Sequence, residues 1–160
     1  MTELAMAPAA TAAEQRREFL TFRLGAESYA VDILKVQEIR DIDRVTRVPH
    51  VPRYLLGVIN LRGAIVPIVD LGLMLGFPEP LPLAQASAIV LNAGGRLTGL
   101  VVASVSDVLG FTDEEIRPAP ELGAERAGVS AIAGIAVREG TTLLILDVER
   151  LLGRIREERK

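Results

Sequence analysis

The chain has 160 residues, which is the length of one ordinary domain, and its composition excludes several classes of protein. Hydrophobic residues make up 49% of it but aromatic residues only 4%, so we expect an aliphatic core. With no cysteine and one histidine, a disulfide framework, a thiol nucleophile and a metal site of Cys or His ligands are not expected. The net charge of −3, with the basic residues spread along the chain, is not typical of a nucleic-acid-binding protein.

Residues 1–16 are small, polar or Ala-rich and are expected to form a flexible N-terminal tail. Glu3 and the lack of early basic residues argue against a signal peptide. The longest apolar region, 54–77, is interrupted by Arg62 and Asp70, so no membrane span is expected there. These features predict a cytoplasmic protein.

The folded part of the chain begins with two predicted strands. Residues 19–24 form the first, residues 25–27 a turn, and a second strand is indicated by the alternation of Tyr29, Val31 and Ile33. After Ile33 the period slips, because the next apolar positions are Val36 and Ile39. The slip predicts a bulge or bend that curls the strand, with a short helical turn as the alternative.

Two further hairpins are predicted, one in each half of the chain. The first joins the apolar runs 57–61 and 64–69 at Arg62-Gly63, and the second joins 134–137 and 141–146 at Glu139-Gly140. A glycine at the shared turn position supplies the positive φ that a tight hairpin needs. Pro67 cannot donate to a sheet, so it indicates an edge or a bulge.

Each of these hairpins is followed by an aspartate and a short apolar segment that ends in glycine. Asp70 precedes a segment ending at Gly76, and Asp147 precedes one ending at Gly153. Asp at the N-cap and Gly after the last turn predict a short helix in both places. A catalytic role for the two aspartates is the less favoured alternative.

These similarities are parts of one internal repeat. Residues 57–76 match 134–153 without a gap, with six identities in twenty positions, at an offset of 77. Residues 20–39 match 89–108 more weakly at an offset of 69, so the second copy has eight extra residues, placed in an exposed segment at 111–131. We predict a mainly β fold of two five-stranded antiparallel barrels, with short helices and a shared apolar seam. The domain is expected over 17–153, with lobes at about 17–85 and 86–153, and a C-terminal tail at 154–160.

The chain resembles the CheW family, the coupling proteins of bacterial chemotaxis, from about Glu18 to Leu152. The most specific match is the sequence GVINLRG at 57–63, followed by IVPIVDL at 65–71. Supporting matches are YAVDI at 29–33, VQEI at 36–39, VSDV at 105–108 and IRPAP at 116–120. The resemblance implies two SH3-like five-stranded barrels around a common core, and no enzymatic activity, cofactor or metal.

The resemblance also implies two partners and the residues that contact them. The family joins the cytoplasmic tip of chemoreceptors to the regulatory domain of a CheA-type histidine kinase. By position, it implies receptor-binding roles for Ile33, Val36, Glu38, Gly57 and Arg62. It implies kinase-binding roles for Arg62, Arg117, Glu121 and Leu122. A protein with these partners is cytoplasmic and is recruited to receptor arrays at the membrane.

Other interpretations of the same residues remain open. Ile33 and Val36 could be ordinary core residues, Glu38 and Arg62 solvated charges, and Gly57 a packing or bend residue. An enzyme or a nucleic-acid-binding barrel is much less favoured than an adaptor, because the chain lacks a grouping of catalytic side chains and a basic aromatic groove. Within the adaptor class, the alternative is a coupling protein of a chemosensory pathway that controls pili, a second messenger or development.

Overall fold

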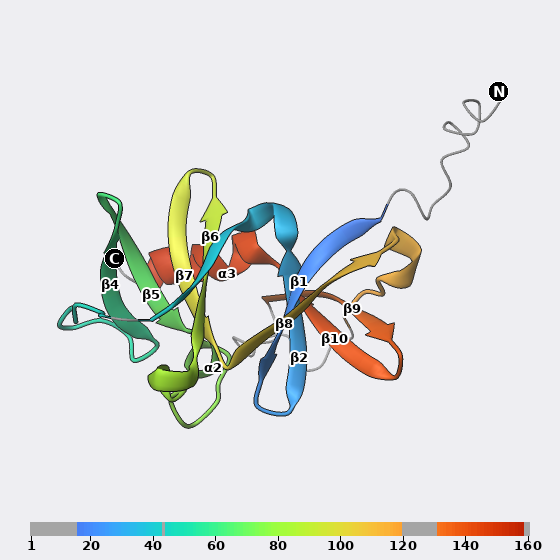
Figure 1. Cartoon of the computed structure of the whole chain (residues 1–160), viewed down its shortest axis with the longest axis horizontal. Helices are drawn as coiled ribbons and strands as arrows, with labels where there is room; N and C mark the ends of the chain where they lie inside the picture. Colours follow the sequence, from blue (N-terminus) through green and yellow to red (C-terminus); the bar gives the residue numbers. More distant parts are fainter. Residues whose placement is uncertain (1–15, 43, 120–130, 159–160) are drawn as a thin grey trace.

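The computed structural model describes residues 16–42, 44–119 and 131–158, and in these parts of the chain ten strands form two five-stranded sheets (Figure 1). Sheet A has the order β8-β1-β2-β10-β9 and contains β1 (Arg17–Leu24), β2 (Glu27–Asp32), β8 (Ser104–Phe111), β9 (Ile132–Arg138) and β10 (Thr141–Leu146). Sheet B has the order β3-β6-β7-β5-β4 and contains β3 (Val36–Asp41), β4 (Leu55–Leu61), β5 (Ala64–Asp70), β6 (Ser87–Ala93) and β7 (Arg96–Val102). The predicted mainly β fold of two SH3-like lobes is confirmed, although the end strands of each sheet do not pair with one another.

Each sheet takes strands from both copies of the sequence repeat. Sheet A combines β1 and β2 of the first copy with β8, β9 and β10 of the second, and sheet B combines β6 and β7 with β3, β4 and β5. The expected lobe boundary at 85/86 is therefore wrong, because both sheets contain strands from either side of it. Each copy of the repeat thus places its last three strands in the sheet that holds the first two strands of the other copy. The two sheets have equivalent strand orders and are related by an approximate two-fold axis.

The exchange also creates a parallel pair in each sheet, where only antiparallel pairs were expected. In sheet A, Ile145 of β10 lies opposite Ala30 of β2, and in sheet B, Ile68 of β5 lies opposite Gly99 of β7. These pairs occupy equivalent positions in the repeat. Pro67 lies just outside the three residues of β5 that pair with β7, so its missing N–H falls where β5 pairs with β4 alone.

The core consists of one large shared cluster and a smaller cluster within each lobe. The shared cluster joins residues of both sheets, among them Phe22, Val31, Ile89 and Leu100, and confirms the predicted apolar seam. Smaller clusters lie within sheet A around Phe111 and within sheet B. Neither lobe can bury the shared surface alone, so the fold depends on both.

The slip in the apolar period after Ile33 has two structural causes. A 3-10 turn, η2 (Ile33–Lys35), separates β2 from β3, which is the helical alternative, and the pairing of β3 with β6 shifts register between Val36 and Glu38. In the second copy, the pairing of β8 with β1 shifts at the equivalent place, between Asp107 and Val105. The repeated bulge was therefore correctly predicted.

The hairpin turns and the aspartate caps follow the sequence prediction. Arg62 and Glu139 have φ of 52° and 51°, so each turn places a non-glycine residue in the left-handed region before its glycine. Asp70 accepts a hydrogen bond from Leu73 N at the start of α2 (Leu71–Met74). Asp147 accepts one from Arg150 N at the start of α3 (Val148–Glu158). Both aspartates therefore cap helices, which is the interpretation that the sequence favoured over a catalytic role.

Two other expectations are wrong. Gly153 does not end its helix, because α3 continues through it to Glu158, so residues 154–158 are helix rather than tail, and Ile155 is buried in the shared core. The segment 111–131 is not simply exposed, since Phe111 and Ala131 are fully buried at its two ends. A short turn, η4 (Asp113–Glu115), and a bridge between Arg117 and Ile135 hold its first part against β9.

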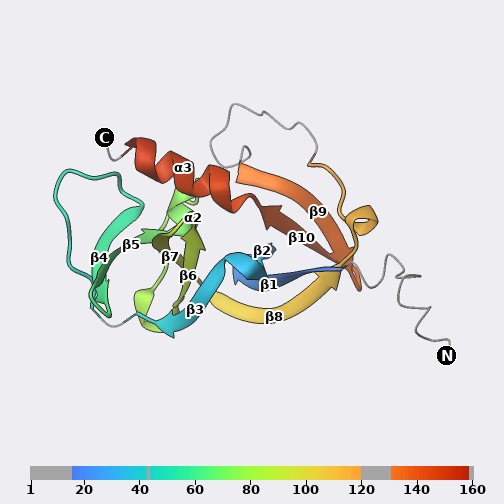
Figure 2. The same ribbon diagram turned by 90° about the horizontal axis from the view of Figure 1, so that it is seen from above.

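Figure 2 shows how the elements divide between two faces of the molecule. The edge strands β3 and β8 lie on one face, and α3 crosses the opposite face from sheet A towards sheet B. A further 3-10 turn, η3 (Leu83–Gln85), precedes β6.

Candidate partner-binding surfaces

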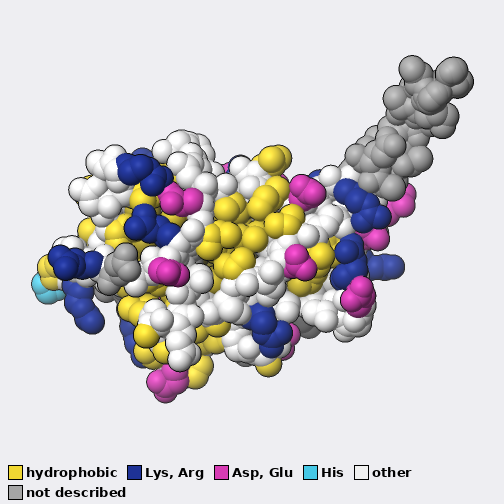
Figure 3. Space-filling view, viewed as in Figure 1, with side chains coloured by type: hydrophobic (Ala, Val, Ile, Leu, Met, Phe, Trp, Pro, Cys, Tyr) yellow, Lys and Arg dark blue, Asp and Glu magenta, His cyan; other side chains and the backbone are white. Residues whose placement is uncertain are grey.

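The face formed by η2, β3 and β8 carries exposed apolar side chains in the middle of the molecule. Leu34 of η2 is 86% exposed, and Ile39 of β3 and Val108 of β8 are each 45% exposed. Figure 3 shows hydrophobic side chains gathered in the centre of this face. We call this surface the central apolar face, and its members are Ile33, Leu34, Val36, Ile39, Val105 and Val108.

The bulges explain why apolar residues spaced three apart in a strand face the same way. Val36 and Ile39 lie opposite Leu91 and Ile89 of β6, both of which belong to the shared core. Val105 and Val108 lie opposite Phe22 and Leu20 of β1, which also belong to it. Cross-strand neighbours share a face of their sheet. The bulge in each edge strand therefore turns both of its apolar residues to the side on which the two lobes meet.

Ile33 and Val36 are partly buried and pack against the shared core. They thus take part in the core, as the alternative interpretation held, and also form the base of the central apolar face. Leu34, Ile39 and Val108 were not selected from the sequence as site residues. The repeated slip in the apolar period was the signal that could have identified Ile39 and Val108.

Glu38 and Arg62 lie together and form an ion pair between β3 and the tip of the β4–β5 hairpin. The side chain of Glu38 is 26% exposed and that of Arg62 is 67% exposed. The guanidinium therefore has a carboxylate partner within the chain, and it remains accessible at the rim of sheet B. The equivalent residues of the other half, Asp107 and Glu139, are both acidic and cannot form such a pair.

Gly57 is buried and has a φ of 150°, a value that residues with a side chain rarely adopt. A Cβ atom at this position would overlap the carbonyl oxygen of Thr46, which accepts a hydrogen bond from Val58 N at 2.8 Å. Gly134, its equivalent, is crowded in the same way, because a Cβ atom there would lie 3.0 Å from Arg117 O. The geometry of Gly57 supports the packing interpretation.

The kinase-binding residues implied by the resemblance do not form one cluster. Arg117 is exposed, and its main chain is hydrogen-bonded to Ile135 of β9 in sheet A, whereas Arg62 lies at a hairpin tip of sheet B. Glu121 and Leu122 lie outside the described residues. Arg62 and Arg117 therefore belong to different lobes.

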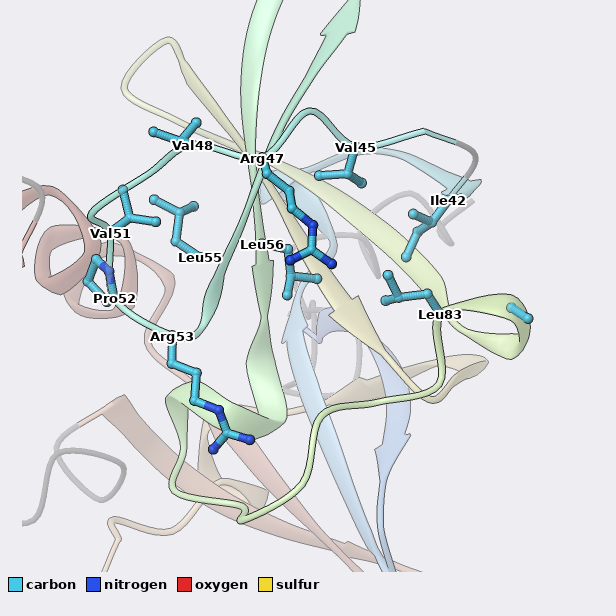
Figure 4. Close-up of a pocket in the computed structure, with 11 residues that line it drawn as sticks. Ile42, Val45, Arg47, Val48, Val51, Pro52, Arg53, Leu55, Leu56 and Leu83 are labelled. Carbon is cyan, nitrogen blue, oxygen red and sulfur yellow. The ribbon is translucent and has the colours of Figure 1, made fainter.

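A cleft of about 510 Å³ lies at the sheet B end, between the segment that precedes β4 and the turn η3. Apolar side chains such as Val48, Leu56 and Leu83 line it, together with two arginines. Figure 4 shows Arg47 extending across the middle of the cleft near Leu56, and Arg53 at its lower edge. Arg53 also donates a hydrogen bond to Pro78 O at 3.3 Å. The sequence interpretation did not identify this cleft.

The buried polar side-chain atoms in the described parts of the chain all have hydrogen-bond partners. Both carboxylate oxygens of Asp70 are used, since Leu81 N donates to the second at 2.9 Å. No group of three or more potential metal-ligating side chains occurs among the described residues. Within the same residues, no helix has the length and apolar character needed to cross a membrane.

An apolar face shared by two lobes, an ion-paired rim and an arginine-lined cleft are features of a protein that binds other macromolecules through its surface. The chain matches the CheW-like domain family over residues 18–156 and belongs to that family. It is 46% identical to a "Chemotaxis protein CheW" of Klebsiella aerogenes, over 85% of this chain and 81% of the relative. It is 39% identical to a "Probable chemotaxis protein CheW" of Rhizobium etli, over 89% of this chain and 91% of the relative.

The fold is also that of a solved family member. The crystal structure of the scaffolding protein TtCheW from Thermoanaerobacter tengcongensis superposes with a TM-score of 0.77 at 27% identity, covering 85% of this chain and 87% of the other. The family resemblance stated from the sequence is confirmed.

Proposed function

We propose that this protein is a coupling adaptor of bacterial chemotaxis that joins the cytoplasmic tip of methyl-accepting chemoreceptors to the regulatory domain of a CheA-type histidine kinase. The family match across nearly all of the folded chain carries this proposal. An adaptor of this kind acts by binding and needs no catalytic step. Its place is in the cytoplasm at membrane-associated receptor arrays, because both partners present their binding regions there.

The central apolar face supports receptor binding. The receptor tip is a helical hairpin, and such a hairpin binds an apolar surface through side chains spaced along its helices. Ile33 and Val36 form the base of the surface, and the ion pair of Glu38 with Arg62 joins its strand β3 to the tip of the β4–β5 hairpin. In this proposal Gly57 contributes by letting Thr46, in the loop before β4, pack closely against that strand.

The ends of the two lobes support kinase binding. Arg62 and the cleft around Arg47 lie at the sheet B end, and Arg117 lies at the sheet A end. Two separate contacts would let one adaptor join two kinase molecules. Surface charges at such sites fix orientation and association rate more than affinity.

A calorimetric titration with the regulatory domain of each chemotaxis-type kinase from the same genome tests the proposal. We expect one-to-one binding in the micromolar range or tighter to one of them, and the genomic pathway of that kinase distinguishes flagellar chemotaxis from another chemosensory output. A matched titration with Arg62→Glu locates the contact. Absence of binding to every kinase domain would contradict the kinase half of the proposed function.

A further inference from the structure

The central apolar face is nearly symmetric about the axis that relates the two halves of the fold. Val36 and Val105 are equivalent and both partly buried, and Ile39 and Val108 are equivalent and both 45% exposed. A hairpin of two antiparallel helices also has an approximate two-fold axis. These four residues alone would therefore offer such a partner nearly the same contacts in two opposite orientations.

Leu34 breaks this symmetry. Its equivalent in the second half is Ala103, which is only partly exposed and lies in a bend rather than a 3-10 turn. Leu34 is 86% exposed, more than any other large apolar side chain in the described parts of the chain. One flank of the face therefore carries a projecting leucine, and the other flank carries a methyl group.

The turn that carries Leu34 is held in place by contacts that the other half lacks. Asp32 Oδ1 accepts a hydrogen bond from Leu34 N at 2.9 Å, and Lys35 Nζ donates one to Glu149 Oε2 of α3 at 2.6 Å. The residues equivalent to Lys35 and Glu149 are Ser104 and Gly72, which cannot form an ion pair. A side chain on a preorganised turn loses less conformational entropy on binding than one on a mobile loop.

We infer that Leu34 determines the orientation in which the helical hairpin of the receptor tip lies across the central apolar face. This inference rests on the proposed receptor-coupling function and adds a specificity-determining residue to it. One helix packs against Leu34, and the reversed orientation leaves that leucine in water while placing the hairpin against Ala103. The charged rim differs between the two flanks as well, so the test is made at high salt, where exposed charges are screened.

The experiment uses the full chain and a single-chain antiparallel coiled coil that carries the hairpin tip of a chemoreceptor from the same genome. A nitroxide label is placed on one helix of this probe, and the broadening of amide signals is measured in the β4–β5 and β9–β10 hairpins. For the unmodified protein we expect broadening in only one of the two hairpins. For Leu34→Ala we expect broadening in both, with affinity weakened on the order of tenfold.

Two variants serve as controls. Ala103→Leu supplies a leucine to the other flank and should also populate both orientations, without the loss of affinity. Val137→Ala truncates an apolar side chain that is 61% exposed on β9, outside the central apolar face, and should change neither readout. Because Leu34 is almost fully exposed, its truncation leaves the fold intact, which the amide spectrum of the free variant verifies.

The outcomes separate this inference from the proposed function. If the probe binds the unmodified protein in both orientations, or binds Leu34→Ala in one orientation only, Leu34 does not set the orientation. If the probe does not bind the unmodified protein at all, the receptor half of the proposed function fails, and the inference fails with it.

Discussion

At the scale of single residues, the ion pair between Glu38 and Arg62 connects two parts of the chain that lie 24 positions apart. It ties the edge strand β3 to the tip of the β4–β5 hairpin, and both side chains stay accessible to solvent. An exposed pair of this kind contributes little to stability, so its main effect is on the charge and shape of the surface.

Replacing Arg62 by glutamate therefore separates binding from folding. In Arg62→Glu a second carboxylate faces Glu38, and we expect weaker coupling of receptor to kinase, with a change in unfolding free energy of less than about 1 kcal/mol. Coupled kinase assays and denaturant titrations measure the two effects. Glu139→Arg changes the charge at the equivalent tip of the other lobe and is the matched control. Unchanged kinase activation in Arg62→Glu would show that this tip has no coupling role.

Tyr29 gives a second prediction at this scale. Burial first, and then the negative charge of Glu27, raise the pKa of the Tyr29 phenol above its ordinary value of 10.0. Since the folded state favours the neutral phenol, this contribution to stability is complete below pH 10.0 and is lost as the pH rises through the raised pKa. The Tyr54→Phe variant leaves Tyr29 as the only tyrosine, so the midpoint of its phenolate absorbance against pH gives the pKa of Tyr29. A midpoint at or below 10.0 would contradict the prediction.

At the scale of elements, the two helices that follow the β4–β5 and β9–β10 hairpins differ although their sequences are related. Gly76 has a φ of 102° just after α2. Gly153 lies inside α3, and a Cβ atom added there would have no neighbouring atom within 4 Å. The extra turns of α3 are stabilised by Ile155, which is buried in the shared core. Packing beyond the repeat therefore decides where each helix ends.

This difference predicts opposite effects for the same substitution. Gly153→Ala removes backbone freedom from a helix interior and should raise the unfolding free energy by about 0.5–1 kcal/mol. Gly76→Ala must place a side chain at a strongly positive φ and should lower it by about 1 kcal/mol or more. Thermal or urea unfolding of the two variants measures both values. A stabilised Gly76→Ala protein would be inconsistent with the left-handed turn after α2.

At the scale of the whole molecule, the exchange of strands makes the two halves of the sequence dependent on each other. Sheet A needs β8, β9 and β10 to complete β1 and β2, and the shared core takes residues from both sheets. The central apolar face has the same origin, since one edge strand comes from each half. A partner that binds this face therefore recognises the complete fold.

A chain opened between Glu79 and Pro80, two exposed residues that precede β6, tests this dependence. We expect neither fragment to give a folded spectrum alone, because each lacks the partner strands of both sheets, and we expect the mixture to recover the spectrum of the intact protein. Amide NMR spectra of the fragments and of the mixture provide the measurement. A well-dispersed spectrum from residues 1–79 alone would mean that a half-chain folds without strand exchange.

The sequence by itself determined the repeat, the hairpins, the bulges, the aspartate caps and the family, because each of these depends on residue types within a few positions or on a match along the chain. Only the tertiary structure decided which strands form each sheet, since pairing between distant segments depends on how both halves bury their common surface. For the same reason it alone brought Glu38 to Arg62, extended α3 through Gly153 and left Leu34 exposed beside two edge strands. Local pattern specifies the elements of this protein, and the burial of a shared core specifies which side chains remain on its surface.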